Sequence, residues 1–205
     1  MNPSLKSSQK GGLKEFGEKV APPYRSIELP NLSRVAEWQD EIPWQPFVDG
    51  AEFPLFGEPH RIRHRPDQRG TVWREGSVIH VAGHPEHLPR RLRDWLIAEL
   101  RCHLVPLVCA KAARVGRPVK RITIRDNRSR WGSCGPNATM TFSWRLVFAP
   151  RDVVDYLVAH EVAHLVHLNH GPRFWALARE LSDGPMEAAD LWLKRNSELL
   201  LQYGA

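Results

Sequence analysis

The stretch from Arg151 to Leu168 constrains the fold of this chain more than any other, because it joins an apolar helix pattern to polar groups. It follows Pro150, contains no Gly or Pro, and is apolar on almost every side. This pattern predicts a buried α-helix. The motif His160-Glu161-Val-Ala-His164 lies inside it. A spacing of four residues puts the two imidazoles one turn apart on the same helix face.

Two histidines and a glutamate on a buried helix predict a metal site, since their burial without partners would carry a large desolvation cost. Paired imidazoles are typical ligands of zinc. Glu161 points about 100° round the helix from His160, which is poor for a ligand but suits contact with a zinc-bound water. We therefore predict about one Zn²⁺ per chain, with a zinc-bound water activated by Glu161 as general base.

A catalytic zinc site normally has three protein ligands, and the chain offers three candidates for the third. His170 follows the expected helix end at Asn169, a residue type that tolerates the left-handed conformation of a tight turn. His170 is the preferred candidate. Glu180 on the next predicted helix is the carboxylate alternative, and His167 within the helix is the other alternative.

The 205-residue chain predicts a single domain over 46–205 behind a polar, proline-punctuated tail over 1–45. No apolar run approaches the length of a membrane span, and the N-terminus lacks a signal-peptide core. The three cysteines show no C-x-x-C spacing, which favours a cytoplasmic location. A net charge of +6 permits an acidic or nucleic-acid partner without requiring one.

The N-terminal half of the domain predicts strands and then a long helix. Residues 54–82 alternate like strands, and one strand would carry a basic face formed by Arg61, Arg63 and Arg65. A leucine stripe predicts a helix over 88–115, which Pro106 should kink or divide. Histidines at 80, 84 and 87 are interpreted as ordinary strand and loop residues.

The C-terminal half predicts two strands, a loop and three helices. Strands are expected over 119–125 and 137–144, with a polar loop over 126–135 between them. After the helix of the His-Glu motif, Pro172 should begin one more helix and Pro185 a last one, which reaches about Tyr203.

Three pieces of the sequence resemble the YgjP-like zinc metallopeptidase-type family, a relative of the SprT-like and other zincins. They are Ser129–Cys134, His160–His164 and Asn169–Trp175, within a resemblance that covers about 120–176. The resemblance implies an α+β, zincin-like fold. In that fold a small, mainly antiparallel N-terminal sheet packs with helices beside the buried helix of the His-Glu motif.

The same resemblance implies His160, His164 and His170 as zinc ligands and Glu161 as the catalytic residue. The tail and residues 50–87 depart from the family core. His167 stands where metzincin proteases have the glycine of their turn, which argues against a true metzincin. Members of the family are labelled metallopeptidase or UTP pyrophosphatase, so both peptides and nucleotides are open as substrates.

The function predicted from these observations is zinc-dependent hydrolysis, with a metallopeptidase favoured over a nucleotide pyrophosphatase. Arg130 is a candidate stabiliser of developing charge, because the resemblance puts its loop near the zinc cleft. Trp131 is interpreted as a packing anchor, and Cys134 is not expected to be a nucleophile. A pyrophosphatase would draw its phosphate-binding cations from one arginine set. That set is Arg61, Arg63, Arg65, Arg125, Arg128 and Arg130. A zinc-stabilised nucleic-acid-binding protein is the third reading, and it leaves Glu161 without a role.

Overall fold

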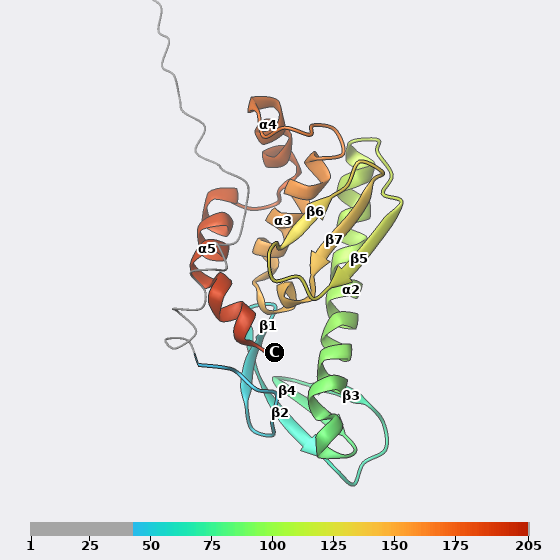
Figure 1. Ribbon diagram of the computed structural model, residues 1–205, viewed down its shortest axis with the longest axis vertical. Helices are drawn as coiled ribbons and strands as arrows, with labels where there is room; N and C mark the ends of the chain where they lie inside the picture. Colours follow the sequence, from blue (N-terminus) through green and yellow to red (C-terminus); the bar gives the residue numbers. More distant parts are fainter. Residues whose placement is uncertain (1–42, 205) are drawn as a thin grey trace, which may run out of the picture.

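The computed structural model describes residues 43–204, which form two small sheets and four α-helices (Figure 1). The predicted tail lies outside these residues except for its last three positions. The elements in chain order are β1 (Glu52–Leu55), β2 (Glu58–Arg65), β3 (Val72–Glu75), β4 (Val78–Ala82), a 3₁₀ turn η1 (Pro85–His87), α2 (Leu88–Arg114), β5 (Arg121–Arg125), β6 (Gly132–Cys134), β7 (Thr139–Ser143), a 3₁₀ turn η2 (Trp144–Phe148), α3 (Arg151–Ala163), α4 (Pro172–Leu181) and α5 (Met186–Gln202). The predicted α+β class is confirmed.

The first sheet has the strand order β1-β2-β4-β3. β1–β2 and β3–β4 are antiparallel, whereas β2–β4 is parallel. Along β2, His60 and Ile62 are buried and Arg61 and Arg63 are exposed, so the alternation in the sequence does produce a basic strand face.

The second sheet has the order β5-β7-β6, and its edge strand β6 packs against α3 (Figure 1). The expectation that the N-terminal sheet lies beside this helix was therefore wrong. The reason lies in residues 126–135, which the sequence analysis assigned to a loop. Gly132–Cys134 pairs with β7, but three residues are too few to show an alternating pattern.

The long helix α2 runs along the molecule and contacts both sheets (Figure 1). Pro106 was expected to kink or divide this helix, and the helix is not divided there. Proline removes one backbone hydrogen bond, yet the buried stripe continues on both sides of it, at Leu104 and Val108. Burial of the stripe thus holds both halves in one helix.

Helix α3 is the buried centre of the domain and packs against α2, α4 and α5. All its residues from Val153 to Ala163 are buried. The helix ends at Ala163, five residues before the predicted end, and His164 forms its C-terminal cap. None of the described helices is long and apolar enough to cross a membrane.

Candidate metal centre

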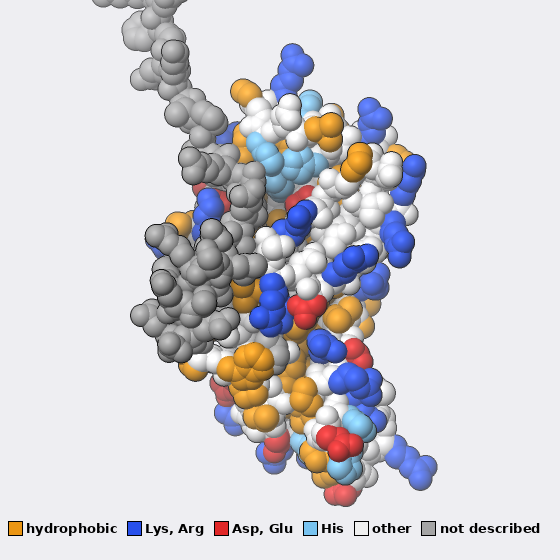
Figure 2. Space-filling model, in the orientation of Figure 1, with side chains coloured by type: hydrophobic (Ala, Val, Ile, Leu, Met, Phe, Trp, Pro, Cys, Tyr) orange, Lys and Arg blue, Asp and Glu red, His pale blue; other side chains and the backbone are white. Residues whose placement is uncertain are grey.

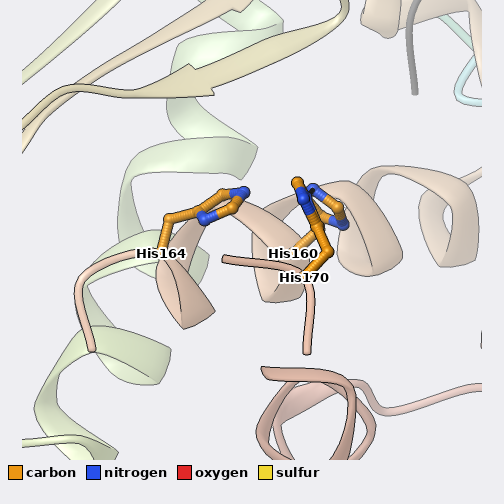
Figure 3. Close-up of side chains that lie close together, drawn as sticks. All are labelled: His160, His164 and His170. Atoms are coloured by element: carbon orange, nitrogen blue, oxygen red, sulfur yellow. Dashed lines mark hydrogen bonds between the residues drawn. The ribbon is translucent and has the colours of Figure 1, made fainter. Parts of the chain in front are cut away.

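Three histidines converge at the C-terminal end of α3. His160 lies in its last turn, His164 caps it, and His170 lies in the loop just before α4. One ring nitrogen from each lies within 4.8 Å of those from the other two. The Nε2 atoms of His160 and His170 are 3.1 Å apart. Figure 3 shows the three rings turned toward a common point.

The early end of α3 is what brings His170 back to the helix. After Ala163 the chain tightens, and the N–H groups of Val166 and His167 both donate to the Ala163 carbonyl. The chain then reverses, and Gly171 N–H donates to the carbonyl of Asn169 at 2.8 Å. The helix start at Pro172 agrees with the sequence prediction, whereas Asn169 does not adopt the left-handed conformation expected there, because the helix has already ended at Ala163.

Phe174 of α4 forms an apolar wall behind the cluster. Its ring centroid lies 4.9 Å from that of His160, 4.6 Å from that of His164 and 4.6 Å from that of His170. Phe174 is fully buried. The three imidazoles are thus held by packing as well as by their backbone positions.

The protonation of the histidines suits metal binding. Burial and the neighbouring His164 and His170 lower the pKa of His160 to about 3, and burial also lowers the pKa values of His164 and His170. All three rings are therefore neutral near pH 7. The Nδ1–H of His164 donates to the carbonyl of His167 at 3.1 Å, which leaves Nε2 with a free lone pair.

The cluster fits a zinc ion. In a tetrahedral site with Zn–N bonds of about 2.0–2.1 Å, two ligand nitrogens lie about 3.3 Å apart. The 3.1 Å separation of the His160 and His170 nitrogens is close to this value. Neither alternative third residue joins the cluster. His167 contributes its backbone carbonyl, and Glu180 is exposed on α4.

Glu161 lies beside the histidines with its carboxylate buried against β6. Its residue is 4% exposed, and burial raises its pKa to about 8, with Arg130 acting in the opposite direction. A Cβ atom on Gly132 would lie 2.7 Å from Oε1 of Glu161 and 2.9 Å from its Cγ. The Glu161 side chain therefore occupies the space that a side chain at position 132 would need.

The residues around Gly132 present one face of β6 to α3. Side chains alternate along a strand, so Cys134 shares the face of Gly132. Burial and Glu161 raise the pKa of Cys134 to about 11, which keeps it a thiol and agrees with its exclusion as a nucleophile. Trp131 points the other way, is buried, and donates from Nε1 to Ser197 Oγ at 3.2 Å, as expected of a packing anchor.

Gly132 belongs to this site, although the sequence analysis gave it no role. The only signal for it was its place in the Ser129–Cys134 piece. The need for glycine arises from a side chain 29 positions later in the chain, so the local sequence cannot reveal it.

The predicted arginine set is split between the two sheets. Arg61, Arg63 and Arg65 lie on β2, at the opposite end of the molecule from α4 (Figure 1). Toward the end of the molecule that holds α4, Lys and Arg side chains lie next to a group of histidines on the face shown in Figure 2. Arg125 ends β5, and Arg128 and Arg130 lie in the loop between β5 and β6, so only this second half of the set is near the sheet that packs on α3.

The second group of histidines does not form a metal site within the described residues. His80 is buried, stacks on Trp73 with ring centroids 5.0 Å apart, and accepts a hydrogen bond from Arg65 Nε. The rings of His84 and His87 are 6.2 Å apart. These histidines have ordinary structural contacts, as the sequence analysis interpreted them.

A family model described as "YgjP-like, metallopeptidase domain" matches residues 30–196. The chain belongs to the YgjP-like family. No curated protein and no solved structure matches the chain. The YgjP-like match extends well beyond the 120–176 region of the sequence resemblance and includes both sheets and α2–α4. The family description supports a metallopeptidase-type hydrolase and implies a metal cofactor, for which the histidine cluster offers the ligands.

Proposed function

We propose that this YgjP-like protein is a zinc-dependent hydrolase of the metallopeptidase type. The observation that carries the proposal is the convergence of three neutral imidazoles next to a buried carboxylate, that of Glu161. We assign the fold as zincin-like because the helix that bears His160 and Glu161 packs against the edge strand of a small mixed sheet.

His160, His164 and His170 would hold the metal. When bound, zinc supplies a Lewis acid that lowers the pKa of water and polarises the group under attack. Glu161 takes the proton of the attacking water and later delivers it to the leaving group. A dication held by the neighbouring histidines would favour the ionised form of Glu161 and oppose the rise in its pKa that burial causes in the metal-free protein.

Arg130 is proposed as a second source of positive charge. It is exposed in the loop just before β6, and its guanidinium opposes the rise in the pKa of Glu161 that burial causes. A fixed cation at this place would stabilise negative charge that develops on the attacked oxygen.

The free edge of β6 favours a peptide as substrate. Ser143 N–H donates to the Trp131 carbonyl and Gly135 N–H to the Thr139 carbonyl, so the odd-numbered residues of this segment face β7. The N–H and C=O groups of Gly132 and Cys134 therefore point to the other side. No residue in 43–204 hydrogen bonds to them. An extended peptide could add here as a further strand beside Glu161.

The nucleotide pyrophosphatase reading is weakened by the split of the arginine set. A triphosphate needs several cations around it, and Arg61, Arg63 and Arg65 lie on the other sheet. Arg125, Arg128 and Arg130 remain for that role. The nucleic-acid-binding reading still leaves Glu161 unused.

The test is hydrolysis of casein and of UTP by the purified zinc-loaded protein, measured side by side. We expect release of peptides from casein and no release of pyrophosphate from UTP. Pyrophosphate release without casein cleavage would replace the peptidase by the pyrophosphatase, and inactivity on both substrates would contradict the proposal.

A further inference from the structure

Two arginines just before β6 are exposed and have no charged partner within the described residues. Arg128 and Arg130 lie in the loop that leads from β5 to Gly132. Neither makes a side-chain hydrogen bond or an ion pair with any residue in 43–204. The carboxylate of this loop, Asp126, is already engaged by the buried Arg145. The loop therefore offers positive charge that is free to bind an anion.

The electrostatic surroundings of this loop are positive. Burial lowers the pKa of the Arg145 guanidinium, Asp126 raises it, and Arg128 and Arg93 of α2 lower it further, so these cations act on one another. The positive charge of Arg130 opposes the rise in the pKa of Glu161 that burial causes. A positive region thus extends from the buried carboxylate of the site toward Arg128.

The direction of β6 links this positive region to a bound substrate. Arg130 and Arg128 precede Gly132 by two and four residues in the loop before β6, so Arg130 lies no more than about 7 Å along the chain from Gly132. If a peptide pairs with the free edge of β6, its reacting bond lies near Glu161, which packs on Gly132. Peptide residues about two to four positions from that bond, on one side, then pass the two arginines.

We infer that this protein selects peptides with Asp or Glu about two to four residues from the cleaved bond, on the side that passes Arg130 and Arg128. The inference rests on the proposed peptidase function. Guanidinium groups bind carboxylates through paired hydrogen bonds, which favours Asp and Glu over neutral polar residues. A Lys at the same positions would meet like charge.

The size of the preference follows from the exposure of the arginines. Exposed ion pairs are weak and screened by salt, so each acidic residue should raise kcat/KM only about threefold to fivefold. The ratio of kcat/KM for a Glu peptide to that for the matching Lys peptide should reach about tenfold at low ionic strength and decrease as salt is added.

The experiment measures kcat/KM of the zinc-loaded protein on fluorogenic peptides that differ only in Glu, Gln or Lys, placed in turn on each side of the cleaved bond. We expect the order Glu, Gln, Lys on one side and no preference on the other. At the peptide position that passes Arg128, Arg128→Glu should reverse this order and Arg128→Gln should flatten it. Arg63→Glu, an equal charge change on the distant strand β2, should leave the order unchanged.

The outcomes separate this inference from the proposed function. Equal cleavage of Glu and Lys peptides would overturn the inference and leave a peptidase. Failure to cleave any peptide would overturn both. A third outcome combines two results. If the peptides show no charge preference, and a single-stranded oligonucleotide binds in a salt-dependent way and binds more weakly to Arg128→Glu, the inference is also overturned. The arginines would then serve nucleic acid instead.

Discussion

At the scale of single residues, the closest relation in the site is between Gly132 and Glu161. An added Cβ at position 132 would come within 3.0 Å of three atoms of the Glu161 side chain. Gly132 does not have a positive φ, so the backbone itself would accept alanine. Glycine is therefore needed for space, and the space is that of the candidate general base.

We predict that Gly132→Ala displaces the Glu161 carboxylate and lowers kcat about 100-fold, because small misplacements of a reacting group are costly. The zinc content should stay unchanged. Gly135→Ala is the control, since its nearest contact is an ordinary 3.5 Å to the Thr139 carbonyl. Peptide turnover and zinc analysis of both variants test this, and a fully active Gly132→Ala would refute the steric argument.

The second residue-scale prediction concerns the pH dependence of stability in the metal-free protein. Burial raises the pKa of Glu161 from 4.5 to about 8. Between these values the folded protein keeps a proton that the unfolded chain releases, so the free energy of unfolding falls as pH rises from about 4.5 to about 8. Glu161→Gln does not titrate and should lack this loss.

Urea unfolding of both chelator-treated proteins at pH 5 and pH 8 checks this prediction. From pH 5 to pH 8, the free energy of unfolding of the variant should rise relative to that of the wild type by an amount on the order of a few kcal/mol. The titration of the three histidines is common to both proteins and cancels in the comparison. A constant difference would show that Glu161 is solvated and ionised throughout.

At the scale of elements, a buried cation ties three helices together around the site. Lys111 of α2 is 2% exposed. Its Nζ lies 2.6 Å from the Asp155 carboxylate of α3, and it donates to the carbonyl of Leu181 at the end of α4 at 2.5 Å. Asp155 also accepts from the N–H of Asp183 at 2.8 Å. This network fixes α4, and with it Phe174, against α3.

Lys111→Met should lower the free energy of unfolding by about 3 kcal/mol or more, because it leaves Asp155 buried without its counter-charge. Arg90→Met on the same helix removes an exposed pair with Asp94 and should cost well under about 1 kcal/mol. Denaturant unfolding of the two variants compares them. If both changes cost the same, the buried network does not hold the helices.

Signals carried by neighbouring residues allowed most of the elements to be predicted. The leucine stripe of α2, the proline starts of α3 and α4 and the alternation of β2 all appear in the structure. The missed features depend on distant partners. They are the parallel pairing of β2 with β4, the short strand β6 and the unbroken course of α2 across Pro106. The early end of α3 belongs to the same group.

The candidate site divides in the same way. The histidine cluster could be predicted because a helix repeat fixes the first two rings and a turn at Asn169 returns the third. The position of the Arg130 loop followed from the family resemblance, and no spacing indicates it. The role of Gly132 could not be predicted from the sequence, since it depends on the contact between β6 and α3.

At the scale of the whole molecule, the site lies where two parts of the domain meet. The ligands come from the end of α3 and the loop before α4, and the candidate base is covered by an edge strand of the second sheet. The first sheet, with its basic strand β2, stands apart at the other end of the molecule (Figure 1). This arrangement places the candidate metal centre at one end of the molecule, away from the basic strand.

The measurement that tests the central claim most directly is peptide hydrolysis by zinc-loaded Glu161→Gln, with zinc quantified in the same sample. Gln keeps the size of the side chain but cannot accept the proton, so the account predicts about one zinc ion per chain and a kcat lowered by about 100-fold or more. Full zinc content with wild-type turnover would contradict the role of Glu161 as the base, and loss of zinc would make it a ligand instead.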